Sequence, residues 1–390
     1  MLSAYRIIKV LVWAITITLF ASCTGRSLFG ESEEEARSWC IFRGNSTLNG
    51  YTQRRLPDQP VIQWTYRADK RTVASPIVND GTCYTCDRHG VLRGIDESGN
   101  PCFEHDMNTL IESNFYLQDS VLYIGQMDGV LTAFSLRDNR NLWQFETEGQ
   151  ISASPNCIST SEGNQILVGS YDNYMYALDA TSGRLEGKFE TGYYINGATA
   201  LHGRYMIFGG CDAWVRIVDT QSGTPTDSLQ LKAYIPASPV VLDNYAYVAD
   251  YSGDLYELEL HDGHIVSHRM LVEAQLAAEE NSGMTSMPVV TEKRIFLFSQ
   301  GRYLSCLNRQ DGQELWRVML RGDVGESSPL VCRDRILVCT RDGHVSILQV
   351  SDGQEFWHFE AGEQIISSPA VVRDAFYILT ARGTLFRFSS

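Results

Sequence analysis

The sequence predicts an all-β protein built from a repeated unit of about 40 residues. Turn signals such as Asp128-Gly129 and Asp342-Gly343 recur at this spacing, and Asx-Gly pairs between alternating apolar residues are strong hairpin signals. A second turn follows each of them about ten residues later, and a small-residue–proline start such as 367–369 precedes it. Apolar runs of strand length lie between these marks. Four antiparallel strands per unit is the pattern of a β-propeller blade.

The first 22 residues are predicted to be a lipoprotein signal peptide. Arg6 and Lys9 precede an apolar run over residues 10–20, two small residues and then Cys23. The run is too short for a transmembrane helix and fits the core of an export signal. The small residues before Cys23 resemble a bacterial lipobox, which implies that Cys23 is acylated and becomes the mature N-terminus. Secretion without a lipid and an uncleaved anchor are the alternatives.

Residues 23–38 are predicted to form an acidic, flexible tether. Glu31 and the run 33–35 cannot bury apolar surface and are expected to stay solvated. Thr24 rather than aspartate follows the cysteine, which in lipoproteins of this kind favours the outer membrane. We therefore expect a protein that is lipid-anchored on the periplasmic face of the outer membrane.

Residues 39–390 are predicted to form one eight-bladed propeller. Eight repeat starts can be found, of which those near Glu112 and Asn196 lack the proline, so seven blades is the alternative. The last repeat stops after three strands, while an orphan strand at 61–68, carrying Trp64, precedes the first. Pairing this strand with the chain end would complete the last blade and remove exposed edges.

Composition excludes some functions. The formal net charge of −15 argues against nucleic acid as a partner, because nucleic-acid binding needs a basic face.

Cys83 and Cys86 have redox or metal spacing, but three residues apart in a strand they point to opposite faces, which favours buried thiols. Asp128, Asp172 and Asp342 lie in hairpin turns and are expected to cap their own backbone.

Three segments carry a family resemblance: YMYALDATSG (174–183), YLSCLNRQDGQELW (303–316) and VSILQVSDGQEFW (345–357). They resemble the PQQ-like repeat, in which a terminal tryptophan docks against the neighbouring blade. The resemblance implies this role for Trp143, Trp316 and Trp357, and for Trp64 on the orphan strand. The third repeat has Gly187 at that position, so its docking is expected to be weaker.

Two groups of proteins share this repeat. One contains quinoprotein dehydrogenases, which hold pyrroloquinoline quinone (PQQ) and calcium on the propeller axis and stack a Cys-Cys disulfide over the quinone. The other is the BamB family of lipoprotein scaffolds in the outer-membrane β-barrel assembly machinery. This chain has no Cys-Cys pair and lacks the common catalytic motifs. We therefore expect a monomeric, non-catalytic scaffold without a cofactor, with a quinoprotein-like enzyme or an envelope ligand sensor as the alternative.

One repeat departs from the period. Pro239 and Pro288 are 49 residues apart, and the extra length contains EAQLAAEE (273–280), a strong helix-forming stretch. Leu271, Val272 and Leu276 would share one face of this helix. That face could meet a protein partner or pack on the propeller itself. With the acidic Glu279 and Glu280, these residues form the predicted partner-binding loop.

Two further candidate binding sites each have a structural alternative. The serines of the repeat starts are expected at the entrance of the central channel, where they could contact a small ligand. The aromatic stretch 192–197 and Trp214 could form a recognition surface or simply pack between blades. The channel serines considered are Ser75, Ser154, Ser238, Ser328 and Ser368.

Overall fold

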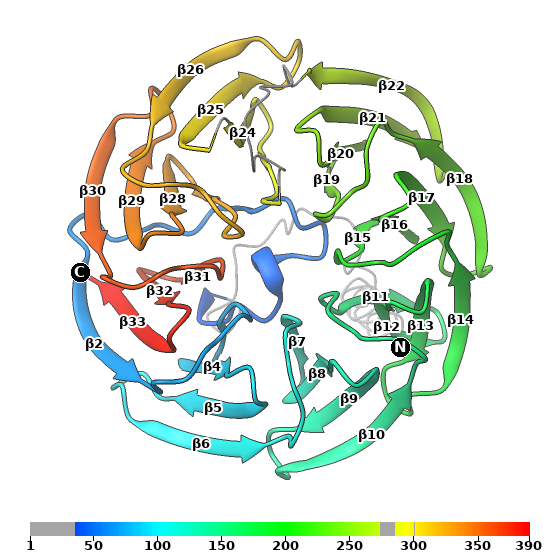
Figure 1. The fold of residues 1–390 in the computed structure, drawn as a ribbon, viewed down its shortest axis with the longest axis horizontal. Helices are drawn as coiled ribbons and strands as arrows, with labels where there is room; N and C mark the ends of the chain where they lie inside the picture. Colours follow the sequence, from blue (N-terminus) through cyan, green and yellow to red (C-terminus); the bar gives the residue numbers. More distant parts are fainter. Residues whose placement is uncertain (1–35, 274–284, 300) are drawn as a thin grey trace, which may run out of the picture.

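The computed structural model describes residues 36–273, 285–299 and 301–390. Eight sheets are arranged around a central axis, and the ends of β2 and β33 meet in one of them (Figure 1). Seven sheets contain four strands each, and the eighth has a fifth strand, β1, added at its inner edge. The predicted eight-bladed all-β propeller is therefore confirmed, and seven blades is wrong.

Each blade runs from an inner strand at the axis to an outer strand at the rim, with antiparallel neighbours. Inner strands are short and buried, whereas outer strands alternate exposed and half-buried residues, as in β10 and β30. In order from the inner to the outer strand, blades 1 to 4 comprise β3 (Ile77–Asn79), β4 (Thr82–Cys86), β5 (Val91–Ile95) and β6 (Pro101–Asp106); β7 (Phe115–Gln118), β8 (Val121–Gly125), β9 (Val130–Ser135) and β10 (Arg140–Glu146); β11 (Asn156–Thr160), β12 (Gly163–Gly169), β13 (Tyr174–Asp179) and β14 (Leu185–Glu190); β15 (Ala200–His202), β16 (Tyr205–Gly209), β17 (Trp214–Asp219) and β18 (Thr224–Gln230).

Blades 5 to 8 follow the same plan, except that the outer strand of blade 8 comes from the start of the described chain. These blades comprise β19 (Val240–Leu242), β20 (Tyr245–Ala249), β21 (Leu255–His261) and β22 (His264–Val272); β23 (Val289–Val290), β24 (Arg294–Ser299), β25 (Tyr303–Asn308) and β26 (Glu314–Met319); β27 (Leu330–Cys332), β28 (Arg335–Cys339), β29 (His344–Gln349) and β30 (Glu355–Glu360); β31 (Ala370–Val372), β32 (Ala375–Leu379), β33 (Thr384–Ser389) and β2 (Val61–Arg67).

The ring closes as the repeat pattern predicted. β2 pairs antiparallel with β33, and Trp64 lies opposite Arg387 in the register. The apolar core is divided among the spaces between adjacent blades: one cluster joins Phe359 of blade 7 to Phe386 and Phe388 of blade 8. Every blade therefore depends on both neighbours for its buried surface.

Tryptophans of the outer strands dock on the next blade. The indole N–H of Trp64 donates to the Glu97 carbonyl at 2.9 Å, and that of Trp143 donates to the Ala180 carbonyl at 3.0 Å. The ring of Trp143 lies over Gly183, where an added Cβ would approach it to 2.6 Å at a φ of +71°. Glycine in this turn thus provides both the left-handed backbone and the space for the ring.

The two remaining docking tryptophans are placed similarly. Trp316 donates to the Val350 carbonyl at 3.2 Å, whereas Trp357 packs edge-on against Phe376 and Phe388 of blade 8. No turn joins β33 to β2 in blade 8, and phenylalanines lie there in place of the turn glycine. At the junction of blades 3 and 4, where no tryptophan is available, a Cβ added to Gly223 would meet nothing within 4 Å.

Candidate functional site

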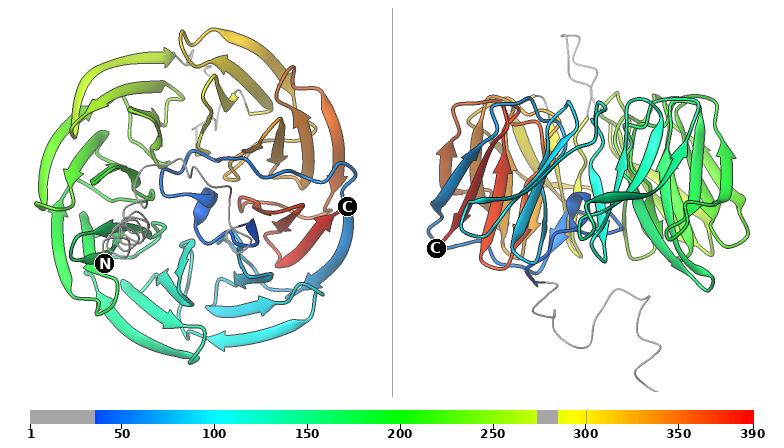
Figure 2. Two further views of the ribbon diagram at one scale, coloured as in Figure 1. Left: turned by 180° about the vertical axis from the view of Figure 1, so that it is seen from behind. Right: turned by 90° about the horizontal axis from the view of Figure 1, so that it is seen from below.

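The two faces of the disc differ because one end of the channel is closed. Residues 36–54, which we call the belt, cross the axis and contain the short 3-10 helix η1 (Phe42–Gly44) and strand β1 (Tyr51–Thr52) (Figures 1 and 2). The belt runs along the turns that join each inner strand to the second strand, and β1 pairs parallel with β27. We call this the belt face and the opposite one the mouth face.

The belt bonds to every blade of the ring. The Trp39 carbonyl accepts from Val78 of blade 1 at 3.0 Å, and the Cys40 carbonyl accepts from Leu117 of blade 2 at 2.8 Å. The Ser46 carbonyl accepts from Asn156 of blade 3. Further belt carbonyls accept backbone N–H groups of blades 4 to 8, from Leu201, Val241, Val290, Val331 and Arg373.

Arg43 lies at the centre of the belt and is 1% exposed. Its guanidinium donates to three carbonyls, those of Leu48, Met287 and Pro288, at 2.9, 3.3 and 2.7 Å. Burial lowers the pKa of Arg43. The side chain thus connects the belt to the start of blade 6.

The mouth face carries a cluster of stacked tyrosines over blades 3 to 5. Tyr171 stacks on Tyr194 with ring centroids 4.9 Å apart, and Tyr234 stacks on Tyr251 at 4.3 Å. Tyr193 adds a third ring to the first stack, 4.4 Å from Tyr194. We call these five residues the tyrosine crescent.

The crescent is exposed although its loops are fixed. Tyr193 is 50% exposed, and Tyr194, Tyr234 and Tyr251 are each between 37% and 39% exposed. Burial and the neighbouring Tyr251 hydroxyl raise the pKa of Tyr234 to about 12, so the ring stays neutral at physiological pH. An exposed group of rigid aromatic side chains is typical of protein-binding surfaces.

Polar contacts beneath the rings hold these loops. The Asp212 carboxylate accepts from the Gly192 N–H at 2.8 Å and from Arg216. Lys232 bridges Asp254 at 3.3 Å and Glu273 at 3.2 Å, which connects the Tyr234 loop to the end of β22. The stretch 192–197 therefore presents its two tyrosines to solvent, while Trp214 is partly buried in β17.

The helix expected to include Leu271 and Val272 is wrong at these two residues, while partner binding by this loop stays a prediction. Leu271 and Val272 are the last residues of strand β22, where Val272 pairs with Leu255, so they do not belong to a helix. Strand pairing prevails over helix propensity here because both side chains pack against the blade 5 core. Leu276, Glu279 and Glu280 lie outside the described residues.

The channel serines bond between blades. The Ser75 hydroxyl accepts from the Ser368 N–H, the Ser368 hydroxyl from the Ser328 N–H, and the Ser328 hydroxyl from the Met287 N–H, each at 3.0 Å. Ser154 accepts from the Asn114 side chain at 2.8 Å, and Ser238 is buried at the corresponding position. These contacts favour a structural role over ligand binding.

Within the described ranges, no three His, Cys, Asp or Glu side chains gather to hold a metal. Cys83 and Cys86 are free thiols that pack into two different core clusters. In the same ranges, no helix is long and apolar enough to cross a membrane.

Fold and repeat together define a PQQ-like repeat β-propeller. The family model described as outer membrane protein assembly factor BamB matches residues 88–281 and 269–389. The chain belongs to this family.

Individual relatives are distant. BamB of Yersinia pestis is 22% identical over 261 residues, which cover 60% of this chain and 63% of the Yersinia protein. BamB of Shewanella oneidensis is 22% identical over 291 residues, which cover 66% of this chain and 70% of that protein. The match thus spans less than two thirds of the Yersinia relative's length.

Solved structures show the same fold in both groups. BamB from Moraxella catarrhalis superposes with a TM-score of 0.69 at 22% identity, covering 85% of this chain and 98% of that one. A europium-containing methanol dehydrogenase gives 0.75 at 10% identity, covering 92% and 99%. At these identities the superpositions establish architecture alone.

Proposed function

We propose that the protein is a non-catalytic, lipid-anchored scaffold that takes part in outer-membrane protein assembly. Membership of the BamB family supports the assembly role. The tyrosine crescent supports the scaffold role, because it is an exposed aromatic surface on fixed loops. The competing proposal, a quinoprotein-like enzyme or a ligand sensor, has less support because the channel serines are engaged between blades.

The crescent is the surface on which we place the partner. Tyr193 and Tyr194 lie in the β14–β15 loop and Tyr234 in the β18–β19 loop, and all three are exposed, so one partner segment could contact both stacks. Stacked tyrosines offer a large contact area at a low entropic cost of ordering. The partner we propose is a subunit of the β-barrel assembly machinery.

Affinity purification from detergent-solubilised membranes tests this. The wild-type protein should recover the barrel-assembly subunit, and Tyr193→Ser combined with Tyr194→Ser should reduce recovery about tenfold or more, as expected for loss of an aromatic anchor. Phe356→Ser is the matched control, because Phe356 is 42% exposed on the rim of blade 7. Equal recovery by the crescent variant and the control would contradict the proposed docking surface. Calcium-dependent PQQ binding with dye reduction would contradict the non-catalytic role.

Lipid anchoring at Cys23, which follows the proposed 1–22 leader, has its own test. The proposed flexible tether 23–38 is wrong at its end, because Ala36 is buried and its carbonyl accepts from the Arg373 N–H at 2.7 Å. Cys23→Ala should move the protein from the membrane pellet to the soluble fraction. Cys102→Ala is the control, because Cys102 is an exposed cysteine on the outer strand β6 of the propeller. Membrane attachment that persists in Cys23→Ala would refute lipidation.

A further inference from the structure

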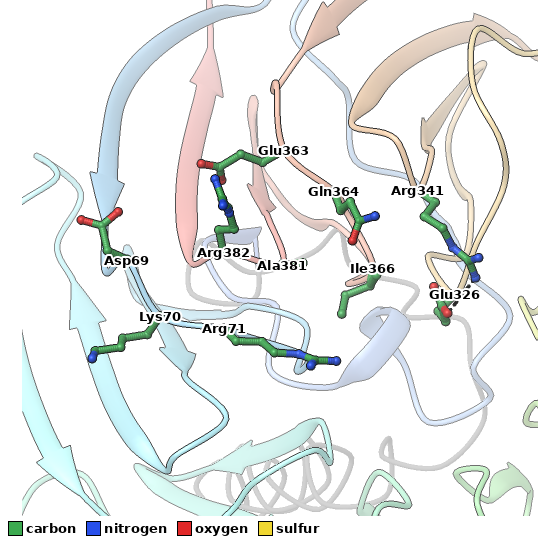
Figure 3. Close-up of a pocket in the computed structure, with 10 residues that line it drawn as sticks. All are labelled: Asp69, Lys70, Arg71, Glu326, Arg341, Glu363, Gln364, Ile366, Ala381 and Arg382. Atoms are coloured by element: carbon green, nitrogen blue, oxygen red, sulfur yellow. Dashed lines mark hydrogen bonds and ion pairs between the residues drawn. The ribbon is translucent and has the colours of Figure 1, made fainter.

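The mouth face contains a cavity that the proposed scaffold role does not use. It has a volume of about 850 Å³ and lies at loops of blades 7, 8 and 1, beside the channel axis (Figure 3). Ligand pockets commonly have volumes of roughly 300–1,000 Å³. The lining residues are Asp69, Lys70, Arg71, Glu326, Arg341, Glu363, Gln364, Ile366, Ala381 and Arg382.

The belt crosses the channel at the other end. Its carbonyls accept hydrogen bonds from Val78 of blade 1 and from Val331 of blade 7, two of the blades that flank the cavity. A molecule in the cavity would therefore enter and leave from the mouth face.

Unpaired positive charge distinguishes this cavity. Arg341 is paired with Glu326 at 2.9 Å, and Glu363 accepts from the Thr380 hydroxyl at 2.6 Å. Lys70, Arg71 and Arg382 form no ion pair with any residue that the structure describes. Asp69 and Glu363 also line the cavity without an ion pair among the described residues, so four cations and three carboxylates sum to a net charge of +1. In a chain of formal net charge −15, this local excess of positive charge favours an anion.

The two arginines are carried by loops that are held together. Next to Arg71, the Thr72 N–H donates to the Ala381 carbonyl at 3.1 Å and the Thr72 hydroxyl to the Thr380 carbonyl at 2.6 Å. The Ala381 N–H, beside Arg382, donates to the Gln364 carbonyl at 2.7 Å. The backbone beneath both guanidinium groups is thus fixed, which lowers the cost of binding.

We propose that this cavity binds an acidic peptide segment. Arg71 points toward the axis in Figure 3 and would take one carboxylate, while Arg382 would take a second. Arginine is well suited to carboxylates because its planar fork can donate two parallel hydrogen bonds. Ile366 and Ala381 would contact the aliphatic part of the peptide, and Gln364 its backbone. The site does not depend on the tyrosine crescent.

Fluorescence anisotropy with a dye-labelled eight-residue Glu/Leu peptide tests the site on the purified protein. The wild type should bind the peptide, and binding should weaken as salt rises, because charges at the surface are screened within about 8 Å at physiological ionic strength. Arg71→Gln combined with Arg382→Gln should weaken binding at least tenfold. Arg137→Gln combined with Arg140→Gln is the matched control, because it removes the same charge from the exposed β9–β10 turn on the belt face.

Peptide binding tests the cavity, whereas recovery of the assembly subunit tests the scaffold proposal, so either proposal can fail without the other. Absence of binding to the wild type, or equal weakening in both double variants, would overturn the site. Complete competition by inorganic pyrophosphate at the same concentration as the peptide would overturn the peptide assignment. A Lys/Leu peptide that binds as tightly would also overturn it. The acidic-peptide site is supported if peptide binding is lost in Arg71→Gln/Arg382→Gln but not in the control, and if pyrophosphate competes only weakly.

Discussion

Aspartates in the mouth-face turns hold two parts of the chain at once. One oxygen of Asp172 accepts from the Tyr174 N–H at 3.0 Å, the local cap that the turn sequence predicted. The other accepts from the Glu148 N–H at 3.1 Å, in the connection that leads into the blade. Asp128 repeats this arrangement, with Thr109 as its second donor at 3.0 Å. Each carboxylate therefore joins a turn to the preceding loop.

Asp212 makes the same kind of bridge beneath the tyrosine crescent, and its negative charge should contribute to folding stability. Burial alone would raise the pKa of Asp212, but Arg216 and the N–H groups of Gly192 and Trp214 outweigh it and lower the pKa from its usual value. A depressed folded-state pKa stabilises the fold above the unfolded value, and this stabilisation is lost as pH falls through the folded value. Asp212→Asn should cost about 1–2 kcal/mol at pH 7, since charge-assisted bonds are lost.

Urea unfolding at pH 7 and pH 3 checks this prediction. The stability difference between wild type and Asp212→Asn should shrink at the lower pH. Asp58→Asn is the control, because the Asp58 side chain is 87% exposed in its pair with Arg335. A stability difference that is constant with pH would show that the carboxylate charge contributes nothing.

The local cap could be predicted from sequence because it spans two residues, whereas the hydrogen-bond donors in the preceding loop could not.

The repeated strands and turns of the blades could be predicted from the sequence, whereas the belt, which is not repeated, could not. Turn pairs such as Asp342-Gly343 mark the blades because each blade needs the same backbone turns. The belt has no period, and it bonds through backbone carbonyls, which every residue carries. Nothing in the sequence pattern shows that residues 36–54 touch all eight blades.

Arg43 tests how much the belt contributes to the ring. Arg43→Met keeps much of the side-chain volume but leaves the Met287 and Pro288 carbonyls without their donor. Loss of three buried hydrogen bonds from a charged group should lower the free energy of unfolding by about 2–4 kcal/mol. Arg55→Met is the control on an exposed side chain of the neighbouring segment and should change stability by less than about 0.5 kcal/mol. Equal melting temperatures for the two variants would mean that the belt merely lies on the ring.

The whole molecule is a ring whose last blade is assembled from both ends of the described chain. β2 pairs with β33 over the register from Val61 opposite Ser389 to Arg67 opposite Thr384, and Trp64 reaches across to blade 1. Without β2, the edge of β33 would be exposed and blades 8 and 1 would lose the tryptophan contact. Sequence reasoning could predict this closure, because a unit of three strands and a spare strand add up to one blade.

Removing β2 should therefore affect the entire ring. Deletion of residues 61–67 should lower the melting temperature by about 5 °C or more, since each kcal/mol shifts a ring of this size by roughly 1–2 °C and an unpaired strand costs several kcal/mol. Trp64→Ala, which keeps the strand pairing, should lose about 1–3 kcal/mol, because the partly buried indole loses its packing and its hydrogen bond to the Glu97 carbonyl. Circular dichroism melts compare these two with Leu142→Ser, a substitution at an exposed residue of β10. A deletion variant that melts with the wild type would mean that the ring is held closed by the belt alone.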